Sequence, residues 1–153
     1  MKFKFAVLAA LLLSACSSNT HLTSTGLLKP EIALAQLGGT SFMMEMGGQL
    51  SIGYNMQVRN RSGEPITLRR LELQTMGSTP YLIRRIPLYF KEPIAPGETR
   101  IMQFSVDALS RGGRTASAEP VTLRGIAYFE SPTGAFQTVF VQYMQQPDGM
   151  PPR

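Results

Sequence analysis

Cysteine and histidine are the side chains whose ordinary pKa values lie closest to neutral pH, and the chain contains one of each. Cys16 is the only cysteine and His21 the only histidine among 153 residues. A thiolate is a good nucleophile, but nucleophilic catalysis also requires a base held in fixed geometry. His21 lies in a polar stretch of small residues, which offers no such framework. The chemistry of Cys16 therefore depends on the residues before it.

The first fifteen residues have the pattern of a cleaved export signal. Two lysines give a basic start, residues 5–13 are apolar, and the small residues Ser14 and Ala15 precede Cys16. Nine apolar residues rise only about 14 Å as a helix, roughly half of the hydrocarbon core of a bilayer. We therefore expect a signal peptide over residues 1–15, and not a transmembrane helix.

The stretch Leu13-Ser14-Ala15-Cys16 closely resembles the lipobox of bacterial lipoproteins. The resemblance implies that the thiol receives a diacylglyceryl group, that a signal peptidase cuts before Cys16, and that the new amine is acylated. Two or more acyl chains hold a protein stably on a membrane. Ser17 resembles the residues that direct such lipoproteins to the outer membrane, which implies a lipid-anchored protein of the bacterial envelope, facing the periplasm. The alternative is an ordinary secretory signal with an incidental cysteine.

Removal of the signal leaves 138 residues, the size of one domain. The formal net charge falls from +5 to +3, because Lys2 and Lys4 are lost. This mild excess without clustering argues against a nucleic-acid partner. A single cysteine allows no intrachain disulfide, so stability must come from packing. Residues 16–29 are expected to be a lipidated tether and residues 145–153 a disordered tail, with the folded domain over residues 30–144.

The domain reads as short strands separated by turn residues. In residues 50–60 apolar and polar residues alternate strictly, which predicts a half-buried antiparallel strand. In residues 66–76 the apolar side changes, so we expect a β-bulge at Arg69 and Arg70. Pro87 favours an edge position or an irregular crossing for the strand that contains it. The other strands are expected at residues 31–37, 41–46, 81–90, 102–106, 121–130 and 135–144.

The turns complete the expected architecture. Gly97 is expected to take a positive φ in a tight turn over residues 93–99, and residues 131–134 to join the last two strands as a hairpin. Seven or eight strands without an amphipathic helix predict an all-β antiparallel sandwich of immunoglobulin or fibronectin III type. A small closed barrel is the rival fold. The longest polar loop is expected at residues 107–119.

Residues 29–107 weakly resemble the LEA type 2 β-sandwich, a module that also occurs lipid-anchored in bacteria. The resemblance rests on Lys29-Pro-Glu-Ile-Ala-Leu34, on the strand that runs into Val58-Arg-Asn60, and on Ile94-Ala-Pro-Gly-Glu98. The chain departs from that family after the strand, where Asn60-Arg61-Ser62 replaces Asn-Pro-Asn. The resemblance implies a sandwich and supplies no catalytic positions.

No motif in the chain predicts an enzyme, a metal site or a cofactor. The carboxylates are scattered singly along strands and turns, where solvated surface charge is the usual explanation. Cys/His metal spacing, a phosphate-cradling loop and a calcium loop are all missing from the sequence. We therefore expect a non-enzymatic protein without a cofactor.

Arginine is the residue type that stands out. It binds carboxylates and phosphates in a bidentate manner and is desolvated more easily than lysine. An arginine-rich face is therefore a candidate docking surface for an acidic envelope protein or for anionic lipid headgroups; the alternative is that these charges discourage aggregation of exposed strands. The candidate residues are Arg59, Arg61, Arg69, Arg70, Arg84 and Arg85.

These observations favour a membrane-anchored interaction or structural module that acts by protein–protein contact, through a sheet edge or the arginine face. The second hypothesis is a sandwich that binds a lipid or a small apolar ligand between its sheets or in a groove. An apolar pocket of several hundred cubic ångströms would favour that hypothesis, and a solidly packed sandwich would count against it.

Overall fold

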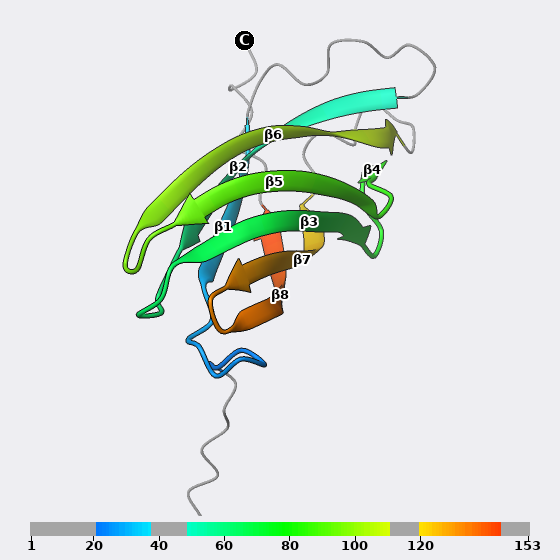
Figure 1. The fold of residues 1–153 in the computed structure, drawn as a ribbon. Coiled ribbons are helices and arrows are strands. Elements are labelled where there is room, and N and C mark those ends of the chain that lie inside the picture. The colour runs from blue at the N-terminus through cyan, green and yellow to red at the C-terminus, as the bar shows by residue number, and fades with distance from the viewer. Residues whose placement is uncertain (1–20, 38–48, 111–119, 145–153) are drawn as a thin grey trace, which may run out of the picture.

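The computed structural model describes residues 21–37, 49–110 and 120–144 as two four-stranded antiparallel sheets (Figure 1). The strand order is β1-β2-β6-β4 in the first sheet and β5-β3-β7-β8 in the second. Within these ranges there is no helix, and the expected antiparallel sandwich is confirmed. The strands are β1 (Glu31–Gln36), β2 (Gln49–Arg59), β3 (Ile66–Met76), β4 (Tyr81–Leu82), β5 (Ile86–Ile94), β6 (Thr99–Ser110), β7 (Val121–Ser131) and β8 (Gly134–Met144).

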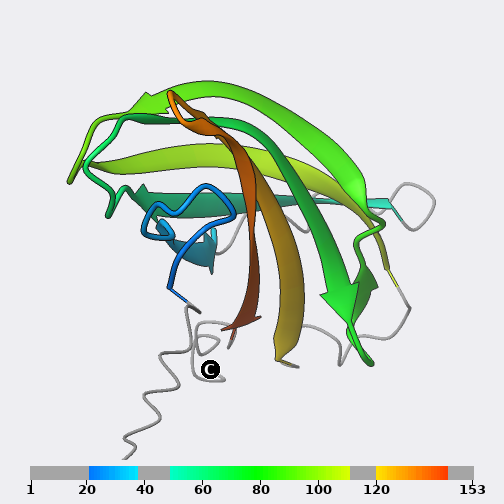
Figure 2. The ribbon, with the colours of Figure 1, turned by 60° about the horizontal axis from the view of Figure 1, so that its bottom comes forward.

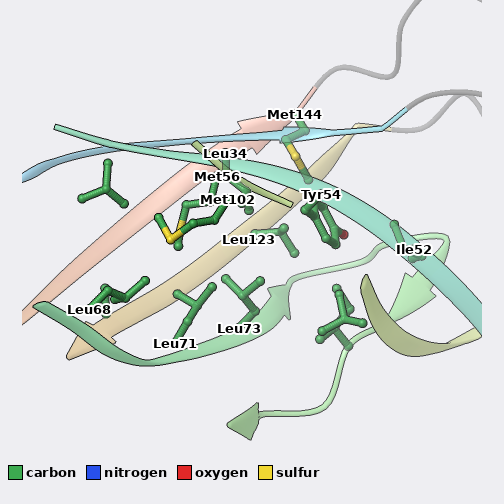
Figure 3. Close-up of a cluster of buried hydrophobic side chains, with 14 of the residues drawn as sticks. Leu34, Ile52, Tyr54, Met56, Leu68, Leu71, Leu73, Met102, Leu123 and Met144 are labelled. Atoms are coloured by element: carbon green, nitrogen blue, oxygen red, sulfur yellow. The ribbon is translucent and has the colours of Figure 1, made fainter. Parts of the chain in front are cut away.

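Alternation along the strands builds the core between the sheets. In β2 every second side chain is buried, as the sequence predicts, and these residues are Leu50, Ile52, Tyr54, Met56 and Val58. Leucines and methionines from the facing strands fill the space between the two layers (Figure 3). The chain crosses from one sheet to the other at every connection from β2 to β7, and only β1–β2 and β7–β8 are consecutive strands of the same sheet.

The bulge in β3 is confirmed. Leu68 and Leu71 are both fully buried although three residues apart, and the register shifts between them. The three steps from Leu68 to Leu71 lie opposite two steps on β7 and four steps on β5. This irregularity in the pairing keeps the inward face of β3 apolar on both sides of the shift.

The strand expected at residues 81–90 is wrong, because the chain changes sheets inside it. Tyr81 and Leu82 form β4 in the first sheet, whereas β5 starts at Ile86 in the second sheet and continues to Ile94. The edge position expected for Pro87 is confirmed, since β5 pairs only with β3. An edge strand needs fewer ladder donors, which explains why β5 also accommodates Pro93.

Two turns confirm the expected chemistry. Gly97 has a φ of 74°, and the turn is closed by the Glu98 N–H, which donates to the Ala95 carbonyl over 3.0 Å. Ser131 pairs with Gly134 at the tip of the β7–β8 hairpin. The strand expected at residues 41–46 and the tail lie outside the described residues, as does most of the expected polar loop; β6 extends through residues 107–110 of that loop.

Residues 21–29, expected to be tether, form a closed loop on the sandwich instead (Figures 1 and 2). The Lys29 N–H donates to the His21 carbonyl over 2.8 Å, and Leu22 bridges Leu28. Thr23 accepts the Leu27 N–H at its hydroxyl over 3.1 Å, and the Leu27 side chain packs against the core. The contact of Leu27 with the core and these hydrogen bonds explain why residues 21–29 pack against the sandwich.

Two tyrosines supply the polar contact inside the core. The hydroxyls of Tyr54 and Tyr81 lie 3.0 Å apart, and Tyr81 donates to Gln36 over 3.0 Å. Burial raises the pKa of both phenols, most strongly at Tyr54. Both side chains therefore stay neutral hydrogen-bonding groups at physiological pH.

Replacement of Gly125 by Ala is expected to destabilise the fold by about 2 kcal/mol, because the Phe140 ring covers this glycine. A Cβ at residue 125 would lie 2.1 Å from Phe140 Cζ, so the ring must leave its place. Chemical denaturation of Gly125→Ala, Phe140→Ala and the double variant measures this. The double variant should lose clearly less than the sum of the single losses; additive losses would contradict the close packing.

Candidate interaction surfaces

One end of the sandwich, here called the entry pole, gathers residues 21–30, 60–64, 95–98 and 131–134. Asn60, which is 1% exposed, holds it together. Its Nδ2 donates to the carbonyls of Glu64 (2.7 Å) and Ile94 (3.1 Å). Its Oδ1 accepts from the backbone N–H of Ser62 (3.0 Å) and from the Ser62 hydroxyl (2.7 Å). The loop after β2 and the loop after β5 are thereby fixed to each other.

Arg59 and Arg61 flank Asn60 and are both exposed. They line an open hollow of about 660 Å³ with Glu31, Leu28 and neighbouring loop residues. Within the described ranges neither guanidinium belongs to an ion pair. We call this feature the arginine hollow.

Most of the other predicted arginines belong to an arginine–glutamate cluster on and beside the outer face of the second sheet. Arg69 donates from Nε to Glu130 Oε2 over 2.7 Å, and its Nη2 lies 2.6 Å from the same oxygen. The two strands meet here because Thr67 pairs with Glu130 in the β3–β7 register. The cluster comprises Arg69, Arg70, Glu72, Arg85, Tyr128 and Glu130.

The second half of the cluster is centred on Glu72, whose side chain is 11% exposed. Arg85 donates from Nε to Glu72, and this hydrogen bond is the main cause that raises the pKa of Arg85. The Arg70 guanidinium lies over the Tyr128 ring at 3.9 Å from its centroid, and Arg70 Nε is 3.4 Å from Glu72 Oε1. Each of the three arginines thus has a glutamate partner, and Arg70 also contacts an aromatic ring, so none of these guanidinium groups is free of an ion pair.

The predicted arginine face is therefore not one surface. Arg59 and Arg61 lie at the entry pole, and Arg69, Arg70 and Arg85 are paired on the second sheet. Arg84 lies toward the opposite end, where it lines a hollow of about 260 Å³ with Asp107 and Ile86. Cys16, the predicted site of lipid attachment, lies outside the residues that the structure describes.

A row of apolar side chains on β8 escaped the sequence interpretation. Val139, Val141 and Tyr143 point outward and are 49%, 61% and 56% exposed. β8 is an edge strand of eleven residues without proline. The signal in the sequence is that residues 139–141 are apolar on both faces, since Phe140 packs inward between two exposed valines. We call these three residues the β8 strip.

The largest interior side chains of both sheets belong to one cluster. A further hollow of about 630 Å³ is open to solvent between the loop of residues 21–29 and the β7–β8 hairpin. In the described ranges no three His, Cys, Asp or Glu side chains come close enough together to hold a metal ion. The same ranges contain no helix with the length and apolarity needed to traverse a bilayer.

The fold is an antiparallel β-sandwich of two four-stranded sheets, and solved structures of other proteins share it. A solved Northeast Structural Genomics Consortium target is 9% identical, with a TM-score of 0.52 over 82% of this chain and 91% of that chain. A crystal structure named for the ApaA protein of Bordetella pertussis is 13% identical, with a TM-score of 0.51 over 78% and 94%. At these identities the likeness shows the fold alone. No family model and no curated protein matches, so the lipobox and LEA type 2 resemblances stay predictions.

Proposed function

We propose that this chain is a lipid-anchored lipoprotein of the bacterial envelope whose β-sandwich is a non-enzymatic interaction module. The lipobox-like stretch ending at Cys16 supports the anchor. A non-catalytic role is supported by His21, which is exposed in a surface loop, and by Glu72 and Glu130, which are committed to arginines. The location that best fits is the outer membrane, with the sandwich in the periplasm.

The exposure of the β8 strip is the observation that supports protein–protein contact. Exposed apolar and aromatic side chains in a row on a sheet face are typical of docking surfaces, because their burial releases ordered water. The other long edge of the same sheet, β5, contains two prolines and is poorly suited to contact by strand addition. The second hypothesis, a ligand between the sheets or in an apolar groove, is less favoured, because the inward side chains of both sheets pack against one another and the hollows of about 630 and 660 Å³ are open to solvent and lined in part by charged side chains.

Replacement of Val141 by Glu is expected to reduce partner contact about tenfold or more, because a charge in the middle of the strip must be desolvated on binding. To measure the contact, Tyr143 is replaced by a photo-activated aromatic residue in the lipidated protein in cells. On illumination this residue forms a covalent adduct with a bound partner, and the yield of that adduct reports the contact. Gln137→Glu adds the same charge on the same exposed side of β8 and is the matched control. Equal adduct yields from both variants, with unchanged thermal stability, would contradict the role of the strip.

A further inference from the structure

The position of the first described residues limits how far the sandwich can stand from a lipid on Cys16. Residues 21–29 are folded onto the entry pole, and the Lys29 N–H donates to the His21 carbonyl over 2.8 Å. Only four residues then separate Cys16 from His21, and the five steps from one Cα to the next span at most about 18 Å when fully extended. A lipid at Cys16 therefore keeps His21, and with it the entry pole, within about 18 Å of the membrane.

The chemistry of the entry pole suits a phosphate surface. Arg59 and Arg61 are exposed at the arginine hollow without an ion-pair partner in the described ranges, and Lys29 lies in the adjoining loop. Guanidinium groups bind phosphates in a bidentate manner. The backbone between the two arginines is fixed by Asn60, so they are presented together.

The acidic groups of the entry pole weaken this positive charge only in part. Glu98 pairs with Arg100 at 2.8 Å, and Glu64 accepts a hydrogen bond from the Thr133 hydroxyl over 3.2 Å. Glu31 is the carboxylate that lines the hollow itself. Because a hydroxyl partner leaves Glu64 charged, Lys29, Arg59 and Arg61 exceed Glu31 and Glu64 by one positive charge.

We propose that the entry pole docks on an anionic phospholipid bilayer, with Lys29, Arg59 and Arg61 in contact with headgroup phosphates. This inference rests on the proposed lipid anchor and goes beyond it, because it fixes the orientation of the sandwich. Basic residues are attracted to an anionic leaflet within about one Debye length, roughly 8–10 Å at physiological ionic strength, and a connection of at most about 18 Å allows the hollow to reach that range. The β8 strip, on a sheet face, then stays free for a protein.

The orientation can be measured with the full lipidated chain in vesicles. Gly63 lines the hollow, and a Cβ there meets no atom within 4 Å, so Gly63→Cys carries a fluorescent dye without strain. Exposed Ser78, between β3 and β4, lies toward the other end, and Ser78→Cys gives the matched label. In vesicles of phosphatidylcholine and phosphatidylglycerol, lipids with a quencher on the headgroup should quench the dye at residue 63 and not at residue 78. In phosphatidylcholine alone this difference should be lost.

Charge reversal identifies the groups responsible. Arg59→Glu with Arg61→Glu should abolish the quenching that depends on phosphatidylglycerol, while the acyl chains keep the protein on the vesicles. Arg84→Glu, an exposed arginine away from the entry pole, is the matched control and should leave the quenching unchanged. High salt should act like the double reversal.

Two results would overturn the proposal. The first is equal quenching at residues 63 and 78, and the second is quenching that survives the double reversal. If, in the second case, the double reversal also abolishes a protein adduct in cells, the hollow is a protein interface. A failure of the proposed lipid anchor is distinguished from a failure of the docking proposal by mass measurement of the N-terminus, because without the anchor the polypeptide carries no acyl chain.

Discussion

Replacement of Cys16 by Ala is expected to abolish incorporation of labelled fatty acid into the chain completely. The thiol is the group that a diacylglyceryl donor would alkylate, and the chain has no second cysteine to replace it. Each buried methylene contributes about 0.8 kcal/mol to membrane binding, so the loss of all acyl chains removes stable attachment. Metabolic labelling followed by mass measurement of the mature N-terminus reports both steps.

The labelled fatty acid is a better readout than membrane fractionation, since an uncut signal could itself hold the precursor on the membrane. Cys16→Ser is expected to behave like Cys16→Ala, because a hydroxyl is a poor nucleophile at neutral pH. Ser18→Ala, two residues later, is the matched control and should be labelled normally. An unlabelled wild-type chain, or label that persists in Cys16→Ala, would refute the anchor.

Replacement of Asn60 by Ala is expected to lower the free energy of unfolding by about 3 kcal/mol, because several buried polar groups lose their partner at once. The carbonyls of Glu64 and Ile94 lose a donor, and the N–H of Ser62 loses its acceptor. Denaturant titration measures the loss. Asn55→Ala makes the same truncation on the outward face of β2 and should change stability by about 0.5 kcal/mol or less.

Asn60→Asp separates the hydrogen bonds from the volume of the side chain. A carboxylate has nearly the same shape but cannot donate, and it would face the carbonyls of Glu64 and Ile94. We expect destabilisation relative to the wild type at neutral pH that diminishes as pH falls, because the protonated acid can donate again. A pH-independent deficit would show that the amide acts by packing alone.

The sandwich could be predicted from sequence because its cause is local. Strict alternation in β2 places one set of side chains in the core, and the change of parity between Leu68 and Leu71 required an irregularity at that point. Gly97 and the β7–β8 turn were likewise readable from residues next to each other.

What could not be predicted depends on contacts between distant strands. Arg69 lies 61 residues from Glu130, and only the β3–β7 register brings the two together. The same holds for Arg85 and Glu72, so composition alone could not distinguish paired arginines from Arg59 and Arg61. The division of residues 81–90 between two sheets could not be predicted either. Ile83 lies in the connection between β4 and β5 but is buried, so its apolar side chain resembles part of a continuous strand.

The parallel course of the first and last strands has a mechanical consequence. β1 runs away from the entry pole, and so does β8, which starts at the hairpin tip and ends at Met144. A pull between an N-terminal anchor and a partner that grips the other end would act along the strand axes. Antiparallel ladder bonds are perpendicular to the strands, so such a load strains the whole β7–β8 ladder together. A load along the strand axes therefore acts on these hydrogen bonds in shear and does not break them one at a time.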